Sequence, residues 1–323
     1  MADEPRPSRY PRFARLGALF ATLLFLGVGS PPPTNTDPDR IVISTSDIDL
    51  FWNVVDGAGG NPDAEAFKKY FSDGSPGVQG FIGERLVSPE HLARIFAQDR
   101  TAYLKARPNM ALVQGQIPRL REDLRRYKRF YPQVLLPNVY FVVGAFNSGG
   151  TAVDGIGEIM GTEILAKDAV ALSKVAPIVA HELTHYNQQD AATNDLLGTA
   201  LNEGSADFIA QLADGNNIDA DQWHFGCTHE AALWEAFQHR MYATDESTIN
   251  KWLFSTDKGP LNAPPFIGYW LGSRIVQSYY DHHADKKAAV AAILHMSDYG
   301  IFLRDSRYAS SGISCHPQAR WNG

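Results

Sequence analysis

The chain has 323 residues, of which 44% are hydrophobic and 20% charged, and its 29 Lys and Arg against 36 Asp and Glu give a formal net charge of −7. These values are typical of a folded globular protein and exclude a disordered chain, a coiled coil, a collagen and a polytopic membrane protein. The acidic balance also argues against a nucleic-acid partner, because such binding depends on Lys and Arg that neutralise phosphates. Two cysteines are too few for a disulfide scaffold or a four-cysteine zinc site.

Residues 1–29 have the three parts of an export signal. Several arginines precede an uncharged apolar run at 16–29, and small residues at its end offer a cleavage site. The run is shorter than the roughly 20 residues that span a bilayer as a helix. We therefore predict a signal peptide at 1–29 and a Pro-rich linker at 30–40. The protein would be exported, periplasmic or extracellular, and tethered to the membrane only where this segment stays uncleaved; a buried helix of the folded domain is the alternative.

From residue 41 to 323 the sequence predicts a single domain. Residues 138–146 are β-branched and aromatic and predict a strand; a turn follows at 147–150, and 156–164 predict a weaker second strand. The predicted fold class is therefore α+β: mostly helical, helical to about 135, with a small sheet from about 136 that precedes the later helices. Apolar residues at helical spacing predict helices at 89–106, 117–130, 175–189, 195–213, 228–243, 266–281 and 286–297.

Two further features each have two interpretations. The strand at 138–146 is either a plain scaffold strand or an exposed edge that pairs with an extended peptide. Cys227 and Cys315 would meet an oxidising compartment after export, where they either pair across a long loop or remain two buried thiols.

The most informative segment is His181-Glu182-Leu183-Thr184-His185. On an α-helix, side chains four residues apart emerge about 40° from each other and roughly 6 Å along the axis, so His181 and His185 can converge on one metal ion. Glu182 lies about 100° round from His181, which suits contact with a metal-bound water better than ligation. The alternative is two histidines on a helix that are packed or exposed for other reasons.

Two acidic residues on the next predicted helix could complete this site. Glu203 follows His185 by eighteen residues, and the intervening turn allows the second helix to fold back against the first. Glu203 could then be the third ligand of a His₂Glu site with one open position, which is the arrangement of catalytic zinc. Asp207, one turn further on, could accept a hydrogen bond from a ligand histidine and fix its tautomer. A solvated acidic residue is the alternative for each.

These residues resemble the pattern of the gluzincin metallopeptidases, HExxH followed by Asn-Glu-x-x-x-Asp on the next helix, here Asn202, Glu203 and Asp207. The resemblance covers roughly 175–213 and implies a zincin-like catalytic domain in which Asp207 supports His181. A closer likeness is to predicted zinc-dependent proteases of bacterial envelopes, which have HExxH followed by Glu-Gly-x-Ala. Some relatives of that group resemble gliding-motility lipoproteins.

The resemblance implies a secreted zinc metallopeptidase that cleaves a peptide or protein substrate with one Zn²⁺ ion. Glu182 would be the general base that takes a proton from the zinc-bound water. The oxyanion needs a further donor, and we select Tyr269 over Arg274, His224 and His229, although each of these could simply be packed or exposed. A Glu182→Gln variant should retain zinc and lose hydrolysis.

Two other functions remain compatible with the sequence. One is a catalytically weak or inactive zinc-binding envelope protein that acts by binding partners. The other is a zinc amidase on cell-wall amides, because the same metal chemistry serves any amide. Metal analysis and chelator-sensitive cleavage would distinguish an enzyme from a binding protein.

Overall fold

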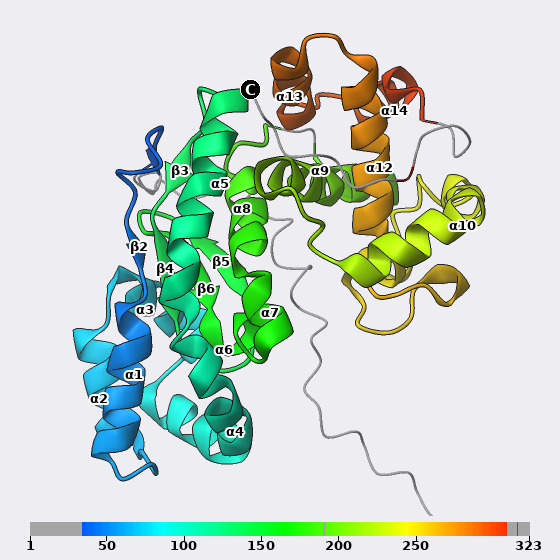
Figure 1. Ribbon diagram of the computed structural model, residues 1–323. Coiled ribbons are helices and arrows are strands. Elements are labelled where there is room, and N and C mark those ends of the chain that lie inside the picture. The colour runs from blue at the N-terminus through cyan, green and yellow to red at the C-terminus, as the bar shows by residue number, and fades with distance from the viewer. Residues whose placement is uncertain (1–33, 190–191, 309–314, 316–323) are drawn as a thin grey trace, which may run out of the picture.

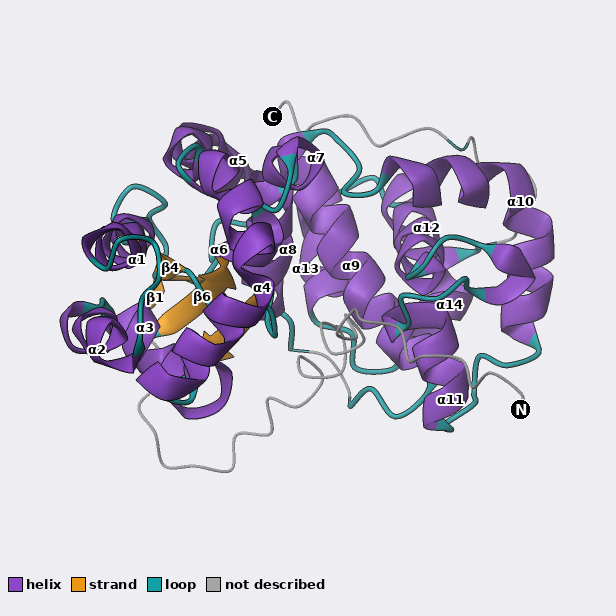
Figure 2. Ribbon diagram, turned by 90° about the horizontal axis from the view of Figure 1, so that it is seen from below, coloured by secondary structure: helices purple, strands orange, loops and turns teal. Residues whose placement is uncertain are grey.

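The computed structural model describes residues 34–189, 192–308 and 315, and the predicted signal peptide lies outside them. Most of the described chain is helical, with a small mixed sheet packed among helices of the N-terminal half (Figure 2). In Figure 1 the sheet lies on one side of the molecule, and the helices from α9 (Leu196–Asp214) to α14 (Tyr299–Ser306) lie on the other. The predicted α+β class and helical majority are confirmed.

The main sheet has four strands in the order β2-β4-β6-β5. The strands β2 (Ile43–Ser44), β4 (Val139–Val142) and β6 (Gly157–Gly161) are parallel, and β5 (Gly150–Val153) is antiparallel to β6. Because β4 has a neighbour on each side, the predicted strand at 138–146 is a scaffold strand, and its interpretation as an exposed edge is wrong. The sequence analysis missed β5, whose first glycine belongs to the predicted turn, and β2, which is too short to leave a pattern.

The helices before the central strands begin at recognisable capping residues. α4 (Pro89–Met110) starts after Ser88, whose side chain accepts a hydrogen bond from the backbone N–H of His91, and a proline occupies its first turn. The predicted helix at 89–106 is thus confirmed and extends further, and the helix at 117–130 has the predicted bounds. The other helices of this half are α1 (Ser46–Gly57), α2 (Ala64–Asp73), α3 (Pro76–Phe81) and α5 (Ile117–Phe130).

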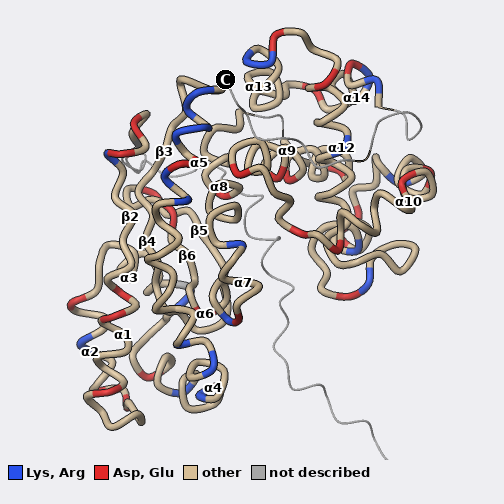
Figure 3. The backbone as a smooth tube through the Cα atoms, viewed as in Figure 1, with Lys and Arg blue, Asp and Glu red and all other residues tan. Residues whose placement is uncertain are grey.

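The described part of the predicted linker, residues 34–40, packs against the domain. Its first strand, β1 (Thr34–Asn35), pairs antiparallel with β3 (Leu136–Pro137). Basic residues recur along α5 (Figure 3), and one of them, Arg125, pairs with Asp39 at 2.6 Å between Nη2 and Oδ1. This part of the chain, predicted as a Pro-rich linker, is therefore held on the domain surface.

The second half of the chain is built from helices that follow the sheet. The predicted helices at 195–213, 266–281 and 286–297 are confirmed within one to three residues, whereas the one predicted at 228–243 begins earlier, where Asp219 caps its first turn. None of the helices in the described ranges is long and apolar enough to cross a membrane. The remaining helices are α6 (Thr162–Leu165), α7 (Ala169–Ser173), α8 (Val175–His185), α10 (Ala220–Gln238), α11 (Glu246–Ile249), α12 (Ile267–His282) and α13 (Lys286–Leu294).

Two glycines allow α9 and α12 to touch backbone to backbone. A methyl group on Gly204 would overlap the backbone of Gly272, and one on Gly272 would overlap the carbonyl oxygen of Ala200. Only glycine leaves room for so close an approach, so α12 fixes the position of α9 at the residue directly after Glu203.

The two cysteines form a disulfide. Cys227 of α10 and Cys315 have Cα atoms 5.6 Å apart and are bonded through their sulfur atoms, which leaves the chain without a free thiol. The alternative of two buried thiols is therefore wrong. The bond attaches Cys315 to α10.

Two buried carboxylates meet where α5 packs on α9. Asp123 is 1% exposed and Asp214 is 0% exposed. Arg126 Nη1 lies 3.0 Å from Oδ1 of Asp123, and Arg119 Nη2 lies 2.6 Å from Oδ1 of Asp214. Burial, followed by the charge of Asp214, raises the pKa of Asp123 to about 7. Asp123 therefore holds a proton in the folded protein under conditions in which an exposed aspartate has lost it.

This raised pKa predicts that stability falls as the pH rises from about 4 to about 7. In that range the folded state keeps the proton of Asp123, whereas the unfolded chain, with a pKa of about 3.9, has released it. Asp123→Asn should reduce the slope and stabilise the protein at pH 8 by on the order of 2 kcal/mol, measured by urea denaturation at pH 5 and pH 8. Burial also raises the pKa of Glu163 to about 7, so part of the dependence of stability on pH should remain in this variant. An exposed control, Glu65→Gln, whose side chain is 77% accessible, should retain the wild-type slope, and an unchanged slope in Asp123→Asn would contradict the prediction.

Candidate metal site

The helix that carries both histidines is short and buried. Val179 and Leu183 of α8 are fully buried, and α8 packs against α5 and α9. The sequence pattern predicts a helix to 189, but α8 ends at His185, because the side chain of Asn187 accepts from the backbone N–H of Leu135 and donates to the carbonyl of Leu183. This amide closes the helix and ties it to the strand region.

Three side chains converge between α8 and α9. His181 Nε2 lies 3.2 Å from His185 Nε2 and 3.4 Å from Glu203 Oε2, and His185 Nε2 lies 3.6 Å from the same oxygen. Metal–ligand bonds of about 2.0–2.1 Å at a tetrahedral angle place ligand atoms roughly 3.3–3.4 Å apart. The three ligand atoms are therefore spaced as a single tetrahedral ion requires.

The outer nitrogens of both histidines are held by neighbouring side chains. His181 Nδ1 lies 2.8 Å from Oδ1 of Asp207, and His185 Nδ1 lies 2.5 Å from Oε1 of Gln188. When Nδ1 donates its proton to such a partner, the lone pair of Nε2 is left for a metal. The Gln188 amide is itself fixed, since its nitrogen donates to the carbonyl of Asn202. Sequence reasoning missed Gln188, which lies three residues after His185 and beyond the end of α8.

The charges of the site oppose one another. Burial disfavours the Glu203 carboxylate, but the positive charges and hydrogen bonds of His185 and His181 outweigh burial and lower its pKa. Burial likewise lowers the pKa of His181, yet hydrogen bonds to Asp207 and Glu203 raise it well above its usual value overall. Since a ligand imidazole must be neutral at its bonding nitrogen, metal binding here would release protons.

Glu182 lies beside the same three side chains. One atom each of His181, Glu182 and His185 can be chosen so that all lie within 4.8 Å of one another. Burial raises the pKa of Glu182, and the charges of the two histidines partly offset this. Glu158 on β6 is a second buried acid nearby, whose pKa is raised by burial and by the charge of Glu182. The sequence analysis missed Glu158, because a carboxylate in a predicted strand carries no signal of burial.

A cavity of about 480 Å³ opens in front of these residues. Its wall includes the apolar side chains of Ile178 and Phe266 and, at its rim, Val170, which is 67% exposed. Tyr269 lines the same cavity, and its ring stacks on that of His181 with centroids 6.0 Å apart. The structure thus brings Tyr269 to the site.

The other sequence candidates for an oxyanion donor lie elsewhere. Arg274 is fully buried and binds Glu230, and His229 stacks on Phe225 with ring centroids 4.1 Å apart. His224 does not line the cavity. The roles assigned to His181, Glu182, His185, Glu203, Asp207 and Tyr269 stay predictions.

A family model described as gliding motility protein GldB, of lipoprotein type by its short name, matches residues 167–310, a range that contains the whole candidate site. No curated protein matches, and no solved structure matches.

This match corrects the functional prediction. The family found is a gliding motility family, so membership of the gluzincin-type metallopeptidases, or of the envelope proteases with HExxH and Glu-Gly-x-Ala, was the wrong prediction. The predicted secreted metallopeptidase function, with its protease and metalloprotease descriptions, is wrong on the same ground. The physical reason is that HExxH specifies how two imidazoles meet, and does not specify what the metal does. That the chain is an enzyme, and that it uses one zinc ion, stay predictions.

Proposed function

We propose that the chain is an exported envelope protein that binds one zinc ion through His181, His185 and Glu203 and works by binding a protein partner. The observation that carries the proposal is the spacing of the three ligand atoms, 3.2–3.6 Å between each pair. Two nitrogen ligands and one carboxylate suit zinc, and Asp207 and Gln188 hold both imidazoles in the ligating orientation.

Three observations support the envelope and partner parts of this proposal. The matching family is named for gliding motility, and its short name marks a lipoprotein, which favours an envelope location and protein partners. The disulfide suits an oxidising compartment outside the cytoplasm. The 480 Å³ cavity beside the ligands, with an exposed valine at its rim, offers a concave apolar surface to a partner segment. Attachment to the membrane would be through the N-terminal segment, since both cysteines are in the disulfide.

Metal analysis of the purified chain tests the zinc part. We expect about one equivalent of zinc in the wild type and at least a tenfold loss of zinc affinity in Glu203→Ala, because loss of a direct ligand should cost no less than loss of the outer-shell partners that cost 10–100-fold. Glu182→Gln is the matched control: it changes the neighbouring carboxylate without removing a ligand and should retain zinc. Absence of zinc from the wild type, or equal zinc affinities of wild type and Glu203→Ala, would overturn the proposal.

Site-specific photo-crosslinking in the envelope tests the partner part. A photoreactive residue at Val170, on the cavity rim, should give a discrete crosslinked protein that disappears when His181→Ala removes zinc. Leu112, which is 56% exposed and outside the cavity, is the control position and should not give this product. A crosslinking pattern that is the same at both positions would contradict binding at the cavity.

A further inference from the structure

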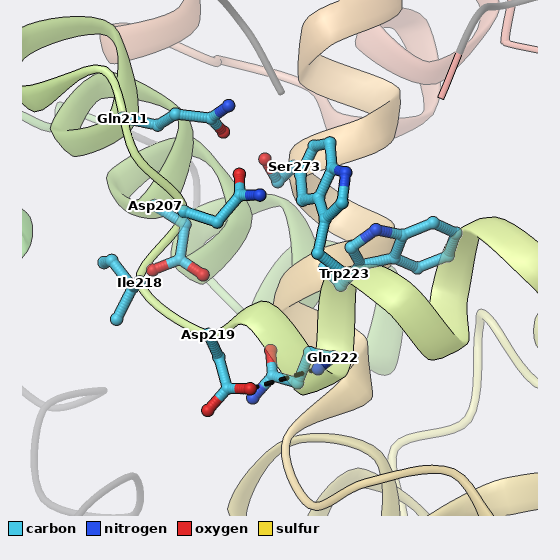
Figure 4. A pocket seen from close by; sticks show the side chains of 9 residues that line it. Asp207, Gln211, Ile218, Asp219, Gln222, Trp223 and Ser273 are labelled. Carbon is cyan, nitrogen blue, oxygen red and sulfur yellow. Dashed lines mark hydrogen bonds between the residues drawn. The ribbon is translucent and has the colours of Figure 1, made fainter. Parts of the chain in front are cut away.

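A second, smaller cavity lies behind Asp207 (Figure 4). Its volume is about 20 Å³, and its walls come from α9, the loop after α9, α10 and α12. It shares Asp207, Ile218, Asp219 and Gln222 with the larger cavity, so the carboxylate that binds His181 also lines this space. The lining residues are Asp207, Gln211, Asn217, Ile218, Asp219, Gln222, Trp223, Trp270 and Ser273.

Four buried polar atoms in the wall of this cavity have no hydrogen-bond partner among the described residues. They are Nε2 of Gln211, Nε1 of Trp223, Nε1 of Trp270 and Oδ1 of Asn217. Gln211 is 3% exposed and Trp270 is 2% exposed. A buried polar group that stays unpaired costs about 1–3 kcal/mol, so four such atoms around one space indicate a shared partner.

We propose that this cavity binds one internal water molecule, which accepts hydrogen bonds from the indole N–H groups of Trp223 and Trp270 and donates to Asn217 and Asp207. The volume suits this occupant, because a water molecule needs roughly 10–15 Å³ of such space and two to four polar partners. The carboxylates of Asp207 and Asp219 in the wall disfavour an anion, and the N–H donors disfavour a cation. A neutral molecule that both donates and accepts suits the two indole N–H groups and the Asn217 oxygen, whereas Nε2 of Gln211 lies outside its four hydrogen bonds.

This water would hold Asp207 in place, and Asp207 in turn orients the predicted metal ligand His181. Oδ1 of Asp207 lies 2.8 Å from Nδ1 of His181, which leaves Oδ2 for the water. A carboxylate held at both oxygens cannot rotate away from the imidazole, so the two tryptophans act as positioning residues for His181 through the water and Asp207.

Two measurements on the full folded chain test the proposal. In the metal-free protein, NMR detection of contacts between water and indole protons should give a long-lived water signal at both Trp223 and Trp270. In metal titrations, Trp223→Phe and Trp270→Phe should each lower cobalt(II) affinity about tenfold, the lower end of the effect of outer-shell partners, and should shift the cobalt absorption bands.

The matched control is Trp52→Phe. Nε1 of Trp52 is also buried without a hydrogen-bond partner among the described residues, but Trp52 lies on α1, away from both cavities. It should leave cobalt affinity and the absorption bands unchanged. Absence of the water signal at both indoles would overturn the water site, and effects of Trp223→Phe and Trp270→Phe no larger than that of Trp52→Phe would overturn their positioning role. Failure of the zinc proposal would be distinguishable, because the water signal is recorded without metal.

Discussion

Arg274→Met should lower the free energy of unfolding by about 3–5 kcal/mol, because it leaves a buried carboxylate without its counter-charge. The Arg274 side chain is fully buried, and its Nε lies 3.0 Å from Oε1 of Glu230. The same carboxylate oxygen accepts from the hydroxyl of Tyr308 at 2.8 Å, so this cluster joins α10 and α12 to the segment after α14. A neutral methionine fills much of the volume of the Arg274 side chain but does not neutralise the negative charge of Glu230. Urea denaturation with an unchanged m-value would measure the loss.

Two further variants make this prediction specific. Arg304→Met removes the arginine of an exposed pair, in which 70% of the Arg304 side chain and 48% of the Asp305 side chain are accessible, and should have a much smaller effect. The double variant Arg274→Met with Glu230→Met should recover much of the stability, because it removes both buried charges. A loss in Arg274→Met that equals the loss in Arg304→Met would contradict the prediction.

Replacement of both cysteines by serine should cost about 4 kcal/mol of stability. Cys227 and Cys315 are 88 positions apart, and closure of a loop of that length restricts the unfolded chain by roughly 4–5 kcal/mol in the chain-entropy model. The midpoint of urea unfolding of the wild type should fall on addition of dithiothreitol. Zinc content should remain, because α10 contributes none of the three predicted ligands.

The double serine variant is its own control for reduction. Dithiothreitol should not change its unfolding midpoint, and mass spectrometry of the wild type should show two fewer hydrogens than the reduced chain. Free thiols in the purified wild type, or a stability that does not depend on reductant, would contradict the disulfide.

Local sequence signals predicted the helices better than the sheet. Ser88 and Pro89 mark the start of α4, and the apolar spacing of α5 defines its bounds, because caps and helical periodicity are properties of neighbouring residues. β2 has two residues and pairs with a strand almost a hundred positions later, so no local sequence pattern predicts it. The end of α8 was missed for the same reason, since Asn187 closes it through a contact with distant Leu135.

In the candidate site, too, local sequence predicted some features, whereas others depend on contacts that form only in the folded chain. The two histidines meet through helix geometry alone, and Glu203 lies 3.4 Å from His181 because α9 packs against α8. Gln188 and Glu158 were missed, because a buttressing amide and a buried acid acquire their surroundings only in the folded chain. The functional prediction was wrong, because the spacing of ligands does not encode the surface that a partner contacts.

The contact of α9 with α12 would couple the proposed zinc ion to the C-terminal helices. Gly204 abuts the main chain of Gly272, so a shift of α12 along its axis would displace Glu203 from the two imidazoles on α8. Thermodynamic linkage then acts equally in both directions. A protein that binds the outer helices would change the affinity of the site for zinc, and zinc would change the affinity for that protein by the same factor.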